Sequence, residues 1–472
     1  MNKCDKSMSY EECELAILRS AVDKAEDIKG YIAASSREIK EIISIVEEFI
    51  ITKELIAYGG TAINNILPPH AQFYDTKKEI PDYDFYSTNA LEDAIELANI
   101  YHAKGYEEIE AKAGVHHGTY KVYVNFIPIA DITCMNKLLF NRLKEESIKI
   151  DDIHYLPPNM LRMSMYLELS RPAGDISRWE KILKRLTLLN KHYPIEVCDN
   201  MNYSSFMRKF ENKKVDQDYL HNIIKKFLAY QNVIFFGGYA SIIYSKFMPP
   251  RIQKKLHKTP DFDVLSNDAN KCALLLKEHL EQKGFHDITI ISHTNVGEII
   301  PEHFQIKINN DTICFIYKTE ACYNYNTITV HGMKLKIATI DTMLSLYLAF
   351  IYASREYYDS NRIICMAHFL FQVQKHNRLA QKGVLRRFSI KCYGKQPTLE
   401  SMRKEKSDMF EKLKKDKNSD EYKSWFLNYK PGEEIRKKER QTRKSKIKVK
   451  KTRKQPPKKK TLKDILKKYL KK

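Results

Sequence analysis

The sequence predicts an α/β protein made of two similar units in tandem, each a mixed sheet with flanking helices. The first observation is an internal repeat: HNIIKKFLAYQNVIFFGGYASIIYSKFMPP, which begins at His221, parallels EIISIVEEFIITKELIAYGGTAINNILPP, which begins at Glu41. The second is that each copy runs from a short apolar stretch into Gly-Gly and then into a helical pattern. A repeat of this length indicates two units of the same fold.

The first Gly-Gly pair is a candidate phosphate site. Leu55–Tyr58 has the apolar composition of a buried strand, Gly59 and Gly60 follow at once, and Thr61–Leu67 has helical composition with Thr at the cap position. A turn of this kind presents backbone N–H groups, and the positive end of the helix dipole favours an anion there. Glycine lets the backbone approach the anion closely.

A pair of aspartates follows the Gly-Gly pair at a short distance. Pro81–Tyr86 alternates carboxylate and aromatic residues, so Asp82 and Asp84 share one face of a predicted strand. Two adjacent carboxylates repel each other, and Mg²⁺ prefers oxygen ligands of this kind. The alternative is an exposed edge strand with solvated acids, but the nearby Gly-Gly pair favours metal-assisted phosphoryl or nucleotidyl transfer.

Asp131 is the candidate third metal ligand. Tyr120–Thr133 predicts two strands that are broken near Asn125–Pro128, and Asp131 lies in the second strand between Ala130 and Ile132. An acid in such an apolar strand requires a reason, because burying an unpaired charge is costly. A metal ion supplies that reason; the alternative is an acid on the surface face of the strand.

A basic segment follows the predicted helix Pro157–Ser170. Arg171, Arg178 and Lys181 lie in a compact turn and helix start. Guanidinium and ammonium groups in such a cluster suit triphosphate oxygens or an RNA backbone. Solvated helix charges are the alternative interpretation.

These motifs resemble a known family. The pattern GG[ST]…DxD is similar to that of the nucleotidyltransferase superfamily of the DNA polymerase β type. The longer strings AYGGTAINNILPP, IPDYDFYS and YVNFIPIADIT resemble the poly(A) polymerase catalytic subunit of large nucleocytoplasmic DNA viruses, of the mimivirus and asfarvirus type. The resemblance is close from Glu38 to Asn190 and looser elsewhere. It implies two tandem polymerase β-like nucleotidyltransferase domains.

The resemblance also implies a reaction and a set of roles. The reaction is untemplated addition of AMP from ATP to the 3′ end of mRNA. Asp82, Asp84 and Asp131 would bind two Mg²⁺ or Mn²⁺ ions and form the catalytic centre. Gly59, Gly60 and Thr61 would bind the triphosphate and Asn64 would support their loop; from the basic segment described above, Arg178 and Lys181 are added as candidate nucleotide-binding residues. The implied partners are the RNA 3′ end, ATP, and a second copy of the chain or a processivity subunit.

The second copy retains only part of this pattern. Gly237 and Gly238 match the first Gly-Gly pair, and Asp261 and Asp263 match the aspartate pair. No acid stands at the place of Asp131, where we expect Ile316 or Tyr317. We therefore expect a degenerate, non-catalytic domain that acts as a dimer or RNA platform.

Charge distribution and pattern changes suggest five parts. Boundaries are expected at 1–36 (helical extension), 37–195 (catalytic domain), 215–385 (second domain), 386–430 (charged helical segment) and 431–472 (basic tail). The formal net charge is +21. The tail alone holds 20 Lys or Arg and 4 Asp or Glu, or +16, which leaves +5 for the rest. Such a tail is expected to be disordered and to bind RNA phosphates.

The cysteines, the N-terminus and the apolar runs indicate the cellular compartment. Nine scattered cysteines show no zinc spacing, and the N-terminus shows no secretory signal, so reduced thiols in an intracellular compartment are expected. No apolar run reaches the roughly 18 residues of a membrane helix. By resemblance the compartment is the host cytoplasm and the virion. Three alternatives stay open: a nucleotidyltransferase with another base preference, a catalytically dead RNA-binding scaffold, and a kinase-like phosphotransferase, which the lack of a Walker A lysine motif disfavours.

Overall fold

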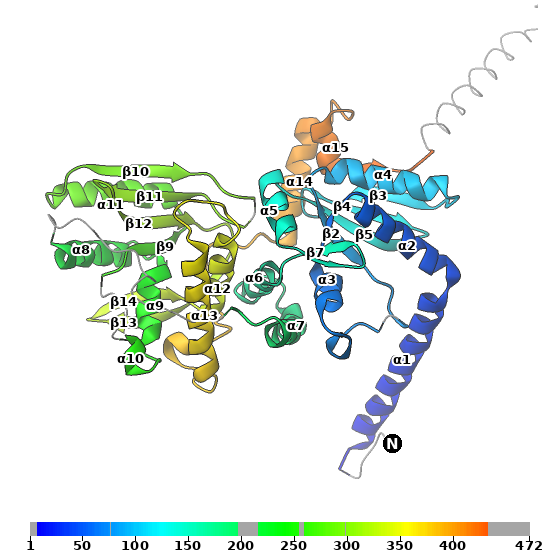
Figure 1. Cartoon of the computed structure of the whole chain (residues 1–472), viewed down its shortest axis with the longest axis horizontal. Helices are drawn as coiled ribbons and strands as arrows, with labels where there is room; N and C mark the ends of the chain where they lie inside the picture. Colours follow the sequence, from blue (N-terminus) through cyan, green and yellow to red (C-terminus); the bar gives the residue numbers. More distant parts are fainter. Residues whose placement is uncertain (1–6, 76, 197–215, 254–258, 298, 433–472) are drawn as a thin grey trace, which may run out of the picture.

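The computed structural model describes residues 7–75, 77–196, 216–253, 259–297 and 299–432. Two mixed sheets of eight strands lie at the two ends of its long axis (Figure 1). The first sheet contains β1 (Ile56–Tyr58), β2 (Tyr83–Ser87), β3 (Ile109–Ala113), β4 (Thr119–Val124), β5 (Ile127–Cys134), β6 (Ile148–Ile150), β7 (Ile153–Tyr155) and β16 (Asn428–Tyr429). The second contains β8 (Ile234–Phe236), β9 (Phe262–Ser266), β10 (Ile288–His293), β11 (His303–Ile308), β12 (Asp311–Lys318), β13 (Tyr323–Val330), β14 (Met333–Ala338) and β15 (Cys392–Tyr393).

Helices cover and connect the two sheets. Those of the first half are α1 (Tyr10–Ser35), α2 (Arg37–Thr52), α3 (Gly59–Ile66), α4 (Ala90–Ala103), α5 (Lys137–Glu145), α6 (Pro158–Leu169) and α7 (Trp179–His192). Those of the second half are α8 (Gln217–Tyr230), α9 (Gly237–Ser245), α10 (Pro250–Gln253), α11 (Ala269–Gln282), α12 (Ile340–Phe350), α13 (Ser360–His376), α14 (Leu399–Leu413) and α15 (Asp420–Phe426). Short 3₁₀ turns occur at Pro69–Ala71, Ile176–Arg178 and Gly383–Leu385.

The two sheets have the same topology. The first has the order β16-β3-β4-β5-β2-β1-β7-β6 and the second the order β10-β11-β12-β9-β8-β14-β13-β15. Matched pairs also run in the same sense: β2–β5 and β9–β12 are parallel, whereas β1–β2 and β8–β9 are antiparallel. The internal repeat predicted from sequence is therefore confirmed as a repeat of fold. Each copy adds one short strand at one edge, β16 in the first and β15 in the second.

Hydrophobic patterning accounts for the elements around the first sheet. Helix α2 buries Ile42, Val46 and Phe49 at helical spacing. Strand β2 buries Tyr83 and Phe85, as the alternation predicts, and leaves the alternate residues half-buried. One local detail differs from expectation, because α3 begins at Gly59 itself and the two glycines form its first residues.

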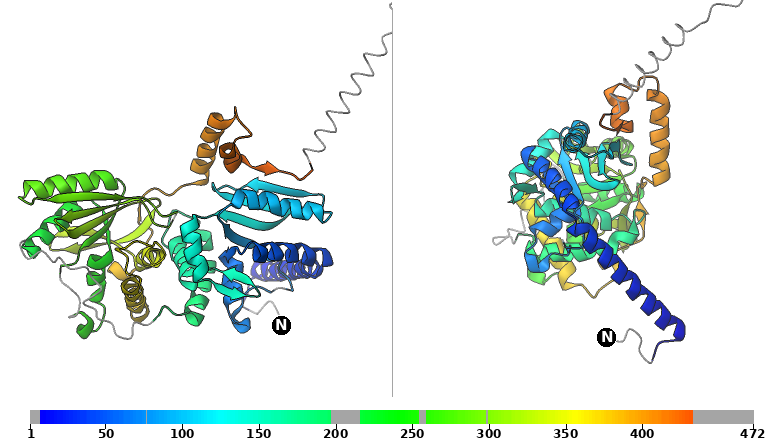
Figure 2. Two further views of the ribbon diagram at one scale, coloured as in Figure 1. Left: turned by 45° about the horizontal axis from the view of Figure 1, so that its top comes forward. Right: turned by 90° about the vertical axis from the view of Figure 1, so that its right-hand side faces the viewer.

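The two halves are joined through α6 and α12, which pack side by side between the sheets (Figures 1 and 2). These are the matching helices of the repeat. The Asn324 N–H also donates a 2.8 Å hydrogen bond to the Ser170 carbonyl. Further along, α14 and α15 return to the first sheet, where β16 pairs with β3 and Trp425 stacks on His117 at 4.1 Å. The charged segment thus extends the first sheet.

The cysteine expectation needs one correction. Cys322 and Cys392 form a disulfide, so the expectation of reduced thiols throughout is wrong at this pair. The two residues are 70 positions apart, and the antiparallel pairing of β13 with β15 brings them together, which sequence spacing does not reveal. Among the described residues, Cys134, Cys272 and Cys314 are free thiols. The predicted basic tail, 431–472, lies outside the described residues except for its first two.

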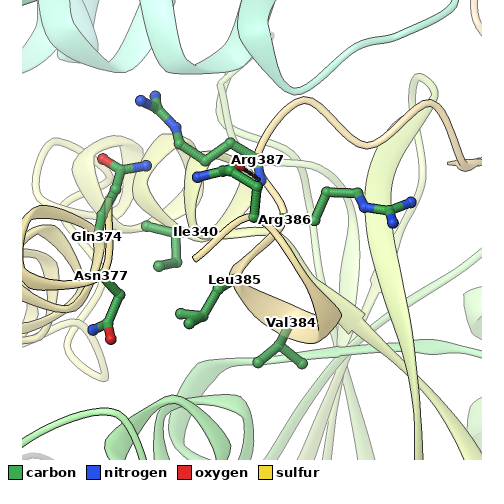
Figure 3. Close-up of a pocket in the computed structure, with 8 residues that line it drawn as sticks. Ile340, Gln374, Asn377, Val384, Leu385, Arg386 and Arg387 are labelled. Atoms are coloured by element: carbon green, nitrogen blue, oxygen red, sulfur yellow. Dashed lines mark hydrogen bonds between the residues drawn. The ribbon is translucent and has the colours of Figure 1, made fainter. Parts of the chain in front are cut away.

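The second half holds a pocket between α12, α13 and the segment that follows α13 (Figure 3). It is lined by Ile340, Gln374, Asn377, Gln381, Val384, Leu385, Arg386 and Arg387. Arg387 pairs with the fully buried Asp341 at 2.6 Å, which fixes the segment after α13 against α12. In the described parts of the chain, no helix has the length and apolarity that a membrane span requires.

Candidate active site

One row of side chains crosses five strands of the first sheet on a single face. In the strand register Tyr58 pairs with Asp84, Asp84 with Asp131, Asp131 with Lys121, and Lys121 with Lys112. Directly paired residues on adjacent strands point to the same face of a sheet. We call these five residues the charged row. Asp82 precedes β2 by one position and is exposed.

The carboxylates of this row perturb one another. The pKa of Asp84 is raised to about 7, first by burial and then by the charges of Asp82 and Asp131. Asp82 is the most exposed of the three, yet its pKa is also raised, first because the surrounding protein partly desolvates its carboxyl group and then by the charge of Asp131, while Lys121 acts in the opposite direction. These directions show that the three aspartates are close enough to repel one another in a poorly solvated place.

Lys121 supplies the positive charge at this place. Its ammonium pairs with Asp131 Oδ2. Burial, the largest single influence, acts to lower the pKa of Lys121, but the hydrogen bond with Asp131 and the nearby negative charges together outweigh it, so the pKa is raised. Asp131 Oδ1 is buried and has no hydrogen-bond partner. In the arrangement described, no three His, Cys, Asp or Glu side chains stand at metal-ligating spacing.

The residues nevertheless fit a divalent cation. Two neighbouring carboxylates have raised pKa values, and a third has a buried oxygen without a partner. Carboxylate oxygens are the ligands that Mg²⁺ and Mn²⁺ prefer, and a cation would remove the repulsion among them. Asp84 and Asp131 are direct partners on adjacent strands, so their side chains lie next to each other on one face of the sheet, where one ion can bind both.

Glycine is required where α3 begins. Gly59 has a φ of +75°, and a Cβ added there would collide with the Asp84 carboxylate. A Cβ on Gly60 would meet the Tyr74 hydroxyl at 2.5 Å and the Arg185 guanidinium at 2.9 Å. The start of α3 therefore lies between the carboxylates on one side and a cation on the other. Backbone N–H groups at such a helix start suit phosphate oxygens.

Thr61 and Asn64 brace this loop. The Thr61 hydroxyl donates a 2.7 Å hydrogen bond to the Asp82 carbonyl, which ties α3 to the aspartate pair. The buried Asn64 side chain accepts hydrogen bonds from the N–H groups of Phe73 and Tyr74, at 2.8 and 2.9 Å. Asn64 thus holds the segment that carries Tyr74 towards Gly60.

The basic cluster of α7 includes a residue that the sequence reasoning missed. Arg185 donates a 2.6 Å hydrogen bond to the Tyr74 hydroxyl and lies over the Phe73 ring at 4.8 Å. The pKa of Lys181 is lowered first by the charge of Arg185, then by burial and by Arg178. Arg178 forms an exposed 3.5 Å ion pair with Glu168. Residues 178, 181 and 185 share one helical face, and that spacing was the available signal.

The second copy lacks most of the charged row. Asp263 pairs with Phe315, so the expectation of Ile316 or Tyr317 at the place of Asp131 is wrong by the register of β12. The corresponding row reads Phe236, Asp263, Phe315, Gln305 and Ile291. Hydrophobic alternation alone does not reveal the register, which the pairing with β9 sets. Only one charge of the row remains in this copy.

Comparisons with known proteins point to one family. Residues 44–175 match the family model described as "Poly(A) polymerase catalytic subunit". A candidate poly(A) polymerase catalytic subunit of African swine fever virus (strain Badajoz 1971 Vero-adapted) is 34% identical over 170 residues, which are 35% of this chain and 35% of that protein. The candidate subunit of Acanthamoeba polyphaga mimivirus is 33% identical over 189 residues, 39% of this chain and 31% of that protein. The match therefore spans about a third of each relative.

A solved structure is similar in fold to nearly the whole chain. The crystal structure of the Megavirus polyadenylate synthase superimposes with a TM-score of 0.75 at 20% identity, over 96% of this chain and 92% of that one. At this identity the likeness concerns the fold. The predicted fold class, with two tandem units, is thereby confirmed. The resemblance to the viral poly(A) polymerase catalytic subunits is confirmed as well, and residues 44–175, which hold all three aspartates, are the part of the chain that carries it.

Proposed function

We propose that this chain is a metal-dependent polynucleotide adenylyltransferase that adds AMP from ATP to RNA 3′ ends without a template. The observation that carries the proposal is the direct pairing of Asp84 with Asp131 beside Gly59. This pairing sets two carboxylates, and the nearby Asp82, next to a helix start that suits phosphate. The family match over 44–175 supports the same reaction.

Each side of the site has its own role in the proposal. Mg²⁺ or Mn²⁺ held by Asp82, Asp84 and Asp131 would supply the Lewis acid that acidifies the RNA 3′-hydroxyl and neutralises the leaving pyrophosphate. Backbone N–H groups of residues 59–61 donate to the triphosphate. Arg185, with Arg178 and Lys181, neutralises its charge at the same end of the site.

Asp131 has a second role in this account. Its Oδ1, which has no hydrogen-bond partner, would accept the proton of the attacking hydroxyl. The second copy, without a third carboxylate, serves as a structural or RNA platform. Processivity would come from the basic tail, a second copy of the chain, or a separate subunit. By the family resemblance, the activity belongs to the host cytoplasm during infection and to the virion.

A nucleotide-preference assay tests the proposal. The full chain is incubated with a short RNA and labelled ATP, GTP, CTP or UTP, in Mg²⁺, in Mn²⁺ or in EDTA. Long products from ATP alone, lost in EDTA, are expected. Long products from another nucleotide would show that the enzyme prefers that base instead of adenine. Products from none would leave an RNA-binding scaffold as the function.

A further inference from the structure

Two lysines lie directly opposite each other in the charged row. Lys121 and Lys112 are cross-strand partners on β4 and β3. Their side chains are 34% and 42% exposed. Like charges in directly opposite positions destabilise a sheet. Each lysine is therefore balanced locally, Lys121 by Asp131 and Lys112 by Glu110 at 3.0 Å.

The internal repeat provides a comparison within the same chain. The second sheet places Gln305 and Ile291 where the first has Lys121 and Lys112, and Phe315 where the first has Asp131. The same topology therefore forms without either lysine. Both lysines are absent from the copy that lacks the third carboxylate, which links them to the chemistry of that carboxylate rather than to the fold.

The lysines lie on a defined side of the carboxylates. In the sheet order, β4 and β3 follow β5 on one side, whereas β1 follows β2 on the other and leads into α3. Gly60 and Arg185 are on the α3 side, where the triphosphate is proposed to bind. An in-line displacement requires the attacking hydroxyl opposite the leaving group. The RNA 3′ end therefore approaches from the side of Lys121 and Lys112.

A polyanion suits this side once Asp131 is engaged elsewhere. If the Lys121 ammonium is displaced from Asp131, it loses its carboxylate partner. It then stands beside Lys112 on the next strand, and neighbouring strands lie about 5 Å apart. The Lys112 ammonium also lies over the Tyr123 ring at 4.2 Å, which adds a half-buried aromatic surface. Paired cations next to an aromatic ring are a common arrangement for single-stranded nucleic acid.

We propose that Lys121 is the resident counter-ion of Asp131, that a divalent cation displaces it, and that Lys121 and Lys112 then hold phosphates of the RNA 3′-terminal nucleotides. This inference rests on the proposed function and assigns the RNA side of its site. It makes metal and RNA binding positively coupled, and such coupling is reciprocal. Metal binding frees one cation for RNA, so RNA binding must strengthen metal binding by the same factor.

Binding measurements without turnover test the coupling. RNA with a 3′-deoxy end is titrated in Mn²⁺ or in EDTA, at matched ionic strength, across a salt series and without ATP. The wild-type slope of log K against log salt should be steeper in Mn²⁺ by about 0.7, one phosphate contact on a single strand. In Lys121→Met the salt slopes measured in Mn²⁺ and in EDTA should coincide. In Lys112→Met both salt slopes should be shallower than in wild type. Lys149→Met, in an exposed ion pair on β6 at the far edge of the sheet, should match wild type.

The metal provides the second readout. Mn²⁺ binding followed by electron paramagnetic resonance should be tighter in Lys121→Met than in wild type, because no ammonium competes for Asp131. Equal or weaker Mn²⁺ binding would overturn the counter-ion role, and a Lys121→Met slope as steep as wild type in Mn²⁺ would overturn the RNA role. Wild type is also assayed for AMP addition in the same buffer. Absence of addition, with the binding changes present, would refute the proposed function alone.

Discussion

Removing one carboxylate from the site should stabilise the metal-free protein. The pKa of Asp84 rises from its ordinary 3.8 to about 7, so the folded state holds its proton more tightly than the unfolded state. Each pKa unit corresponds to about 1.4 kcal/mol, so the ionised side chain costs the fold at most about 4 kcal/mol. The stabilisation by protonation is complete below pH 4 and is lost as the pH rises through 7. Asp84→Asn cannot ionise and avoids this loss.

Thermal melting in EDTA measures the effect. At pH 8 Asp84→Asn should melt several degrees above wild type, and the difference should shrink as the pH falls and approach zero only near pH 4. Mg²⁺ should stabilise wild type and leave the variant unchanged, because ligands stabilise only the state that binds them. Asp152→Asn is a suitable control, since that exposed acid is paired with Lys149 and its pKa is lowered. An Asp84→Asn variant that melts at or below wild type at pH 8 would refute the electrostatic account.

Three further predictions concern the helix start, the α7 cluster and the tail. Gly59→Ala should lower the melting temperature and the rate of AMP addition, whereas Gly237→Ala, which also meets an aspartate at positive φ, should lower the melting temperature only; equal rate losses would contradict the division between copies. Arg185→Met should raise the KM for ATP roughly tenfold or more with little change in RNA affinity, the loss expected for one charge-assisted contact of about 1.5–3 kcal/mol; an unchanged KM would remove Arg185 from the triphosphate site. Deleting 431–472 should lower RNA affinity and its salt slope and shorten the products, while single-AMP addition at saturating RNA survives; identical slopes would reject an RNA-binding role for the tail.

Local patterns in the sequence predicted much of the fold. Alternation around Asp84 predicted which residues of β2 are buried, and the repeat predicted the matching sheets. The apolar neighbours of Asp131 identified it as an acid that needs a partner. These signals are local in sequence, because they depend on which face of one strand or helix each side chain occupies.

Features set by pairing between distant elements were not predicted. Lys121 became part of the site only through the antiparallel register of β4 with β5, and Phe315 took the place of Asp131 only through the register of β12 with β9. The Cys322–Cys392 pair depends on the contact of β13 with β15. Arg185 was within reach of helical periodicity, but its contact with Tyr74 depends on how a loop folds back over α3.

The central claim is that catalysis belongs to the first copy and requires its third carboxylate. Single-turnover addition of one AMP to a short RNA by wild type, Asp131→Ala and Asp263→Ala, each shown to be folded by its melting curve, tests this claim most directly. The account predicts that Asp131→Ala abolishes addition and that Asp263→Ala, at the matching aspartate pair of the second copy, proceeds at nearly the wild-type rate. The account would be contradicted if folded Asp131→Ala added AMP at a near-normal rate. It would also be contradicted if folded Asp263→Ala were inactive.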